Sequence, residues 1–114
     1  MSDCLFCKIA TGELPTELVH EDEEFVAFRD ISPQAPVHVL VIPRRHIASL
    51  VETDASDAPI LGRLQSTAIE VARKQGLGES GFRLVTNCLE DAGQAVPHIH
   101  LHLLGGRRLS WPPG

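Results

Sequence analysis

Apolar residues alternate with histidines in the segment HIHLHLL, residues 98–104. Along an extended strand successive side chains point to opposite faces, so alternate residues lie on the same face. The interleaved Ile99, Leu101 and Leu103 would pack into a core beneath a helix. The opposite face of this predicted strand would carry the histidines His98, His100 and His102.

Other apolar segments predict four more strands, around residues 18–19, 25–28, 38–43 and 82–87. Apolar residues recur at helical spacing from Pro59 to Gly76, after a capping Asp57, which predicts one long helix. The start of the chain and the segment after residue 43 favour short helical pieces. This order predicts an α+β domain with a sheet of about five mainly antiparallel strands, one long helix and one or two short helices.

The bulk composition narrows the class of protein. The sequence has no repeat and no linker, so residues 1–114 are expected to form a single domain, with the N-terminal segment and the C-terminal tail packed on it. A net charge of -5 argues against a surface that coats nucleic acid, because such binding is driven by lysine and arginine. With no apolar export signal and no run of about 18 apolar residues, the expected location is the cytoplasm.

Two of the three cysteines, Cys4 and Cys7, form a C-x-x-C motif. A disulfide framework is not expected in a chain without an export signal. The motif is therefore half of a metal site, a redox pair, or a motif without special function. A redox pair normally follows a strand and begins a helix, and only three residues precede this one.

Three histidines on one strand face indicate a function more strongly than a solvated surface does. They could hold a catalytic metal together with a bound water. Alternatively, one histidine is a nucleophile and its neighbours orient it and manage protons. Spacing alone does not separate these hypotheses. Main-chain N–H groups at Gly93 and Gln94 could approach an anion, and His38 and Asn87 could reach the same face.

Several motifs together resemble one known family. HIHLHLL matches the histidine-triad signature, and FCKIATGELP, VAFRDISPQAPVHVLVIPRRHI, GFRLVTN, GQAVPHIHLHLLGGR and the terminal WPPG are similar to histidine-triad nucleotide-binding proteins of the purine nucleoside phosphoramidase branch. The resemblance implies the histidine-triad fold, a homodimer and a purine nucleoside monophosphate pocket. It also implies hydrolysis of purine nucleoside phosphoramidates through a nucleotidyl-histidine intermediate, which releases a 5'-monophosphate and an amine without a catalytic metal.

The resemblance also assigns roles around the phosphate. His100 would attack the α-phosphorus while its other ring nitrogen donates to the carbonyl of His98. His102 and His38 would contact phosphate oxygens and supply a proton to the departing amine. The remaining phosphate-side positions would hold the leaving-group side or a non-bridging oxygen; they are Asn87, Gly93 and the main chain at Ala95.

The nucleoside side follows by the same resemblance. Asp30 would accept both ribose hydroxyls. Trp111 would reach toward the active site of the partner subunit. The purine would lie between apolar side chains, of which Phe28 could equally be ordinary core; they are Leu5, Phe6, Phe28 and Ile31.

The resemblance extends to a metal, and it has one departure. Cys4, Cys7, His46 and His98 would form a structural zinc site of two cysteines and two histidines. At position 95, where the family often has serine, this chain has Ala95, so a hydroxyl near the phosphate is missing. That departure motivates a second hypothesis, a nucleotide-binding regulatory protein with vestigial hydrolysis.

Overall fold

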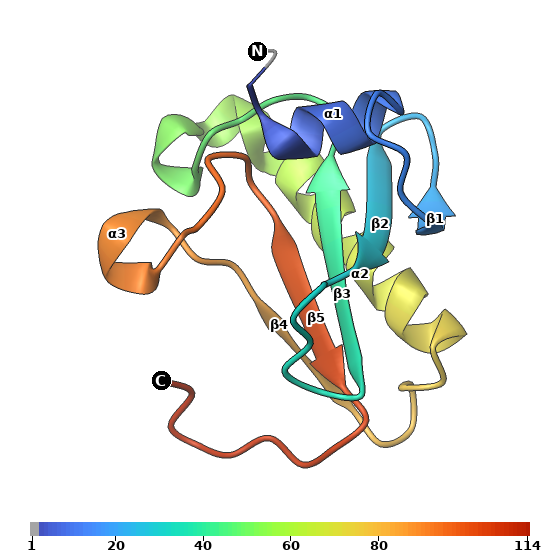
Figure 1. Ribbon diagram of the computed structural model, residues 1–114. Coiled ribbons are helices and arrows are strands. Elements are labelled where there is room, and N and C mark those ends of the chain that lie inside the picture. Colours follow the sequence, from blue (N-terminus) through green and yellow to red (C-terminus); the bar gives the residue numbers. More distant parts are fainter. Residues whose placement is uncertain (1–2) are drawn as a thin grey trace.

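The computed structural model describes residues 3–114, so the first two residues of the predicted N-terminal segment lie outside the described part. It confirms the predicted α+β class, with three helices and five strands in those residues (Figure 1). Two short 3-10 turns precede the long helix, at Leu50–Glu52 and Ala55–Asp57. The elements follow in the order α1 (Leu5–Thr11), β1 (Leu18–Glu21), β2 (Phe25–Arg29), β3 (Val37–Pro43), α2 (Ala58–Lys74), β4 (Phe82–Val85), α3 (Leu89–Ala92) and β5 (Leu101–Gly105).

The five strands form one antiparallel sheet in the order β1-β2-β3-β5-β4. The last strand, β5, lies between β3 and β4. Its residue His102 is opposite Leu40 of β3 and Val85 of β4. The part of the histidine segment that forms β5 is therefore an interior strand, whereas β1 and β4 form the two edges.

Helix α2 covers one face of the sheet (Figure 1). Its apolar side, which includes Leu64, Ala68 and Val71, packs against Leu101 and Leu103 of β5 in one buried cluster. The apolar half of the histidine segment thus faces the long helix, as the alternation predicted. Gly105 ends β5 where a Cβ atom would lie only 2.6 Å from a methyl group of Leu77, so glycine permits this close approach. No helix within residues 3–114 has the length and apolarity required to cross a bilayer.

Helix α1 crosses the opposite face, near one end of the strands (Figure 1). Phe6 and Ile9 pack there against strand residues that include Phe28 and Leu40. Cys4 precedes the helix as its N-cap, because its sulfur accepts the N–H of Cys7 at 3.3 Å. The N-terminal C-x-x-C motif is therefore part of a helix start that lies on the sheet.

The strand in the histidine segment is shorter than predicted. It begins at Leu101 rather than at residue 98. The N–H of Ile99 donates to the carbonyl of Ile47, outside the sheet, at 2.7 Å. The facing strand ends in Pro43, which has no N–H and whose carbonyl accepts from the His98 ring at 2.8 Å. His98 and His100 consequently precede the ladder, in irregular backbone.

Truncation of a core residue of β5 should destabilise the protein strongly. Leu103 is fully buried between the sheet and α2, so Leu103→Ala should lower the free energy of unfolding by about 2–5 kcal/mol, through lost burial and a residual cavity. Urea denaturation measures this loss. Ile31→Ala is the control, because Ile31 is 98% exposed and its truncation should change the value by about 0.5 kcal/mol or less. Equal effects of both substitutions would contradict this packing.

Candidate functional site

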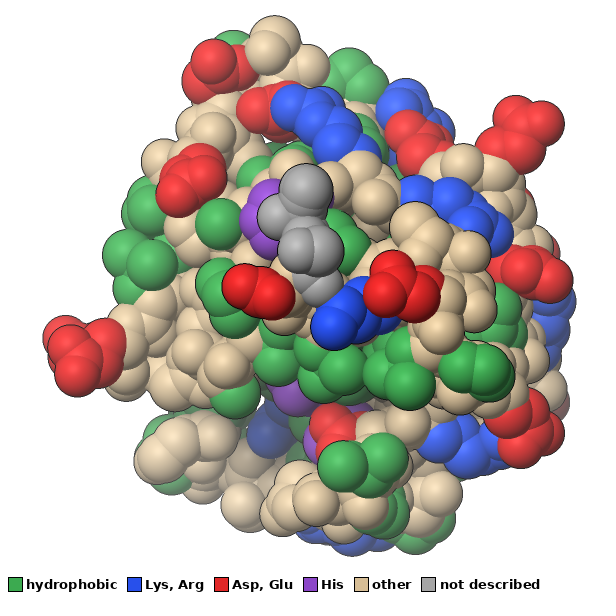
Figure 2. All heavy atoms as spheres, turned by 45° about the horizontal axis from the view of Figure 1, so that its top comes forward, with side chains coloured by type: hydrophobic (Ala, Val, Ile, Leu, Met, Phe, Trp, Pro, Cys, Tyr) green, Lys and Arg blue, Asp and Glu red, His purple; other side chains and the backbone are tan. Residues whose placement is uncertain are grey.

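A cavity of about 530 Å³ opens between α1, the end of β2 and the loop that leads into β5. Figure 2 shows histidine side chains recessed in a hollow beneath hydrophobic side chains. All ten positions predicted from the sequence for nucleotide binding meet in this cavity. They are Leu5, Phe6, Phe28, Asp30, Ile31, Asn87, Gly93, Ala95, His100 and His102.

The proton on the His100 ring is placed by a main-chain carbonyl. His100 Nδ1 lies 2.8 Å from the carbonyl oxygen of His98, and a carbonyl can only accept. Nδ1 therefore carries the hydrogen of the neutral ring, and Nε2 keeps a free lone pair. The edge of the Phe6 ring contacts this imidazole, with the ring centroids 5.1 Å apart. A buried imidazole with a free Nε2 at the cavity is suited to nucleophilic attack.

His102 and His38 form a pair beside His100. His38 Nε2 lies 2.9 Å from His102 Nδ1. Burial, followed by repulsion from His100 and His38, lowers the pKa of His102 to about 4, although Asp30 opposes this shift. His102 is therefore neutral at ordinary pH. His38 does not line the cavity and is only 7% exposed, and its expected contact with phosphate oxygens stays a prediction.

Asp30 lies where β2 ends and reaches the cavity with part of its carboxylate free. Its Oδ1 accepts the N–H of Ser32 at 2.8 Å, and its Oδ2 lies 3.5 Å from His38 Nε2. The lone pairs that remain can accept hydroxyl donors. Phe28, which could have been either core or cavity wall, is both, because it is 5% exposed and also lines the cavity.

The loop before β5 differs from the expected anion cradle. The N–H of Gly93 donates to the carbonyl of Glu90, and that of Gln94 to the carbonyl of Leu89, so both groups are used to end α3. Gly93 has φ +77, a conformation that glycine adopts readily. Within residues 3–114 the N–H of Ala95 makes no hydrogen bond, and Ala95 lines the cavity. The main-chain donor available to an anion is therefore at position 95.

The Gln94 side chain, in contrast, supports this loop. Its Oε1 accepts the N–H of Leu89 at 2.9 Å, and its Nε2 donates to the carbonyls of Ala48 and Val96. Leu89 has φ +67, which is unusual for a side chain of its kind. This supporting role of Gln94 was not predictable from the sequence, because a glutamine next to a glycine carries no distinctive signal.

Four predicted metal ligands meet beside the same histidine segment. Ligand atoms of Cys4, Cys7, His46 and His98 all lie within 4.8 Å of one another. His98 Nδ1 is 3.3 Å from Cys4 Sγ and 3.3 Å from His46 Nδ1. Tetrahedral zinc with bonds of about 2.0–2.1 Å to nitrogen and about 2.3 Å to sulfur separates its ligand atoms by about 3.3–3.8 Å. The residues present therefore fit zinc.

The ring of His98 is oriented for this cluster. It is fully buried, and its Nε2 donates to the carbonyl of Pro43 at 2.8 Å, which leaves the lone pair on Nδ1 facing the sulfur atoms. Burial lowers the pKa of His98, so the ring favours its neutral form, the one that can bind a metal. Burial raises the pKa of the Cys7 thiol, and the nearby Cys4 raises it further, which a bound cation would oppose.

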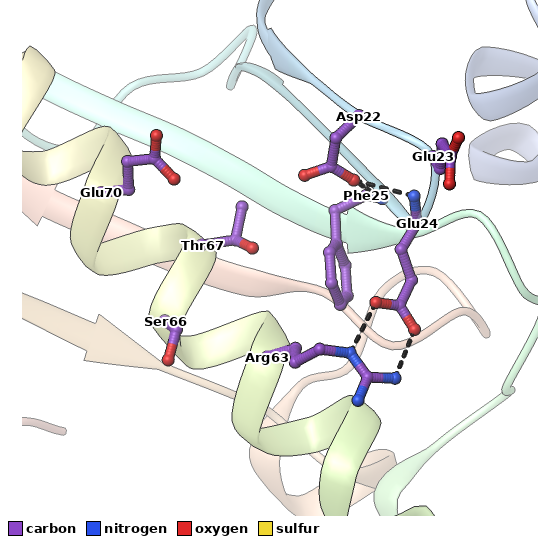
Figure 3. A pocket seen from close by; sticks show the side chains of 8 residues that line it. All are labelled: Asp22, Glu23, Glu24, Phe25, Arg63, Ser66, Thr67 and Glu70. Atoms are coloured by element: carbon purple, nitrogen blue, oxygen red, sulfur yellow. Dashed lines mark hydrogen bonds and ion pairs between the residues drawn. The ribbon is translucent and has the colours of Figure 1, made fainter.

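A larger hollow, of about 700 Å³, lies elsewhere, between the β1–β2 turn and α2 (Figure 3). Its charged groups are already paired. Arg63 donates two hydrogen bonds of 2.6 Å to the Glu24 carboxylate. Asp22 accepts two main-chain N–H groups, and its other oxygen lies 2.8 Å from His20. These pairs fasten the turn and α2, and they give His20 a structural contact.

The other predicted positions lie outside the cavity. Trp111 is 79% exposed and does not line it, so its predicted role toward a partner subunit stays a prediction. The tail that carries Trp111 is attached to β4, because Arg83 donates to the carbonyl of Ser110 at 2.9 Å. Cys88 is the N-cap residue of α3 and makes no side-chain cap bond.

Comparison with known proteins supplies a family for this arrangement. A family model described as HIT domain matches residues 11–109. The chain is 48% identical over 114 residues to the 14 kDa zinc-binding protein of Brassica juncea, covering 98% of this chain and 100% of that protein. Among solved structures it is similar to a HIT family hydrolase from Legionella pneumophila, with a TM-score of 0.96 and 52% identity over 98% of this chain and 100% of that one.

A more distant solved structure is also similar. It is a histidine triad nucleotide-binding protein from Candida albicans, with a TM-score of 0.80 and 30% identity, and the match covers 96% of this chain and 82% of that one.

The cysteine and histidine cluster should bind one divalent metal ion per chain. The double substitution Cys4→Ser and Cys7→Ser should abolish binding, because the two sulfur ligands are lost. Metal content after dialysis, measured by elemental analysis, gives the stoichiometry. Cys88→Ser is the matched control and should keep one ion, since Cys88 is not in the cluster. Retention of the ion by the double variant would exclude the site.

His102 should make stability depend on pH. Its pKa is about 4 in the folded protein, against 6.5 for an unperturbed histidine, so between these values the unfolded chain binds more protons. The free energy of unfolding should therefore fall as the pH is lowered from 6.5 to about 4. Urea denaturation with a metal chelator at stepped pH measures this, and His102→Gln should flatten the dependence. An unchanged slope in the variant would contradict a lowered pKa.

Proposed function

Because the chain belongs to the HIT domain family, we propose that it hydrolyses purine nucleoside 5'-phosphoramidates through a covalent nucleotidyl-histidine intermediate. The observation that carries this proposal is the hydrogen bond from His100 Nδ1 to the carbonyl of His98, which leaves a lone pair on Nε2 at the cavity. A neutral imidazole of this kind attacks phosphorus at neutral pH and makes a reactive phosphoramidate.

The first chemical step forms one bond and breaks another. His100 Nε2 attacks the α-phosphorus, and the bond from phosphorus to the amine nitrogen breaks. The ring gains positive charge, which the His98 carbonyl stabilises by accepting Nδ1–H at 2.8 Å. In the second step water attacks phosphorus and releases a proton to solvent, the bond to Nε2 breaks, and the 5'-monophosphate leaves with neutral His100 restored.

His102 stabilises the phosphate as a neutral hydrogen-bond donor. Its pKa of about 4 keeps it uncharged at pH 7 before a ligand binds, so it meets the phosphate as a neutral donor. The N–H of Ala95 is a second donor to a phosphate oxygen. The departing amine takes its proton from solvent, which reaches the cavity mouth beside the exposed Ile31.

The nucleoside occupies the apolar part of the cavity. Phe6, Phe28 and Leu5 form walls for a purine ring, and Ile31 lies at its open edge. Asp30 accepts from the ribose hydroxyls with its free lone pairs. Apolar walls grip any purine face, so this pocket favours purines as a class.

The metal site is proposed to be structural. Bound zinc would tether the start of α1 to the sheet through the Cys4, Cys7, His46 and His98 cluster. A metal-dependent hydrolase with the three histidines as ligands is disfavoured, because His98 belongs to this cluster. The described residues contain two groups that could hold a metal, and His100 belongs to neither.

The alternative proposal is a nucleotide-binding protein with vestigial hydrolysis. It is favoured by the absence of a hydroxyl at Ala95, which lies on the phosphate side of the cavity. Tight binding of AMP without turnover of any phosphoramidate would support it. An Ala95→Ser variant that gains turnover would identify the missing hydroxyl as the cause.

We propose that the chain forms a homodimer through the β4 side of the sheet. Strand β4 is an edge strand, and beside it lies an apolar hollow of about 150 Å³. An unpaired edge next to apolar side chains favours pairing with a second copy. The hollow is lined by Leu50, Leu61, Leu64, Gln65, Thr86 and Leu101.

Loss of the nucleophile should abolish turnover. An adenosine phosphoramidate should be hydrolysed to AMP, and His100→Ala should slow the reaction by a factor on the order of 10³ or more. Chromatographic detection of AMP measures the rate. His20→Ala is the control and should keep full activity, because His20 lies in the edge strand β1 and does not line the cavity. Full activity in His100→Ala would exclude the proposed mechanism.

Dimerisation should depend on the apolar hollow beside β4. Sedimentation equilibrium should give the mass of two chains for the native protein. Leu61→Glu should reduce it to one chain, since a charge there would be buried in the interface. Ser66→Glu, on the side of α2 that lines the Figure 3 hollow, should leave the dimer intact. A native protein with the mass of one chain would refute the proposal.

A further inference from the structure

The His38 ring behind the cavity is oriented by a main-chain group. The N–H of Gln34 donates to His38 Nδ1 at 3.0 Å. Since a main-chain N–H can only donate, His38 Nδ1 must hold a lone pair. The hydrogen of the neutral His38 ring is therefore on Nε2.

The hydrogen on His38 Nε2 in turn determines the tautomer of His102. His38 Nε2–H lies 2.9 Å from His102 Nδ1, which must accept it. The hydrogen of the neutral His102 ring is therefore on Nε2, and His102 is the member of the pair that lines the cavity. In the reverse arrangement His38 would carry a hydrogen on Nδ1, directly against the N–H of Gln34, and one donor would have no acceptor.

Gln34 is held in position by Arg107. Two nitrogens of the guanidinium, Nε and Nη2, donate to the carbonyl of Gln34 at 3.2 and 2.9 Å. The Gln34 side chain also donates to the carbonyl of Ser32 at 2.9 Å. Just before Arg107, Gly106 has φ +91 and passes so close to the loop that a Cβ atom would lie 2.9 Å from Pro36 Cβ. Glycine at this point lets Arg107 reach over the loop.

We propose that the main-chain N–H of Gln34, held by Arg107, fixes the tautomers of His38 and His102, so that His102 presents an N–H and not a lone pair to the cavity. Arg107 is then a positioning residue for the phosphate donor. The catalytic value of this arrangement rests on the proposed function, whereas the tautomers themselves do not.

A second consequence concerns metal ions. Asp30, His38 and His102 bring potential ligand atoms within 4.8 Å of one another, a group that resembles a divalent-metal site. Coordination through His38 Nε2 needs a lone pair there, and the Gln34 N–H keeps a hydrogen on that atom instead. The fixed tautomer of His38 therefore keeps metal ions out of the catalytic cavity, although the nearby cluster of cysteines and histidines is suited to bind one.

Nitrogen-detected NMR of the zinc-loaded protein, with histidines labelled with ¹⁵N, tests the tautomers without turnover. His38 should be protonated at Nε2 and unprotonated at Nδ1, and His102 should be protonated at Nε2. In Arg107→Ala the two rings should show mixed tautomers, and Arg107→Lys, which keeps one donor, should restore them in part. Arg108→Ala is the matched control, because Arg108 is the exposed neighbour and the hydrogen bonds to the Gln34 carbonyl come from Arg107.

Titration with Co²⁺ gives a second readout that a merely structural role would not change. The native protein should bind one equivalent, with the intense charge-transfer absorption of thiolate ligands. Arg107→Ala should bind a second equivalent with weak absorption, and excess AMP should displace that one alone. If the function holds, kcat should also fall by about tenfold in Arg107→Ala with little change in KM.

Two results would overturn the inference. A hydrogen on His38 Nδ1 in the native protein would show that the Gln34 N–H does not fix the tautomers. Native tautomers and a single cobalt in Arg107→Ala would remove the role of Arg107. Absence of phosphoramidate turnover would count against the proposed function only, because neither the NMR nor the cobalt measurement depends on turnover.

Discussion

The hydrogen bond from the buried His98 ring to the carbonyl of Pro43 is the constraint on which both candidate sites depend. It holds Nε2–H at 2.8 Å and so turns Nδ1 toward Cys4 and Cys7. The main chain of the same residue accepts the Nδ1–H of His100. A rotation of the His98 ring would therefore remove a nitrogen from the metal cluster, and a shift of its main chain would disturb the support of the His100 ring.

Main-chain groups decide the protonation of the other rings in the same way. His100 faces a carbonyl, which can only accept, and His38 faces an N–H, which can only donate. In a buried environment a mismatched pair would leave a polar group unsatisfied, at a cost of about 1–3 kcal/mol. The geometry of the backbone, rather than a choice among side chains, thus fixes where each hydrogen lies.

The sequence predicted the parts of the fold that follow from local pattern. Strand alternation identified Leu101 and Leu103 as the residues under the long helix. Apolar spacing between Pro59 and the glycine stop identified α2, although Asp57 at its N-cap makes no side-chain cap bond. The strand start at Leu101 was not predictable, because it depends on Pro43, which lies far away in the sequence. Spacing within the C-x-x-C motif likewise identified only half of a metal site.

The residues that line the cavity were predicted from the sequence, but their arrangement was predicted only in part. The resemblance supplied the cavity residues, yet not the position of His38 behind His102. It also favoured Gly93 as a phosphate donor, although its N–H is used to end α3. Such details depend on which main-chain groups already make hydrogen bonds, and residue types do not indicate this. Gln34 and Arg107 were missed for the same reason.

Helix α1 belongs to both sites at once. Cys4 and Cys7 supply sulfur to the metal cluster, and Phe6 between them places its ring against His98 and His100, at centroid distances of 6.0 and 5.1 Å. Whatever fastens this helix to the sheet also shapes the cavity wall. By thermodynamic linkage, if metal binding strengthens nucleotide binding, then nucleotide binding strengthens metal binding by the same factor. A metal in the cluster and a ligand in the cavity would then both act on the packing of one helix of 7 residues.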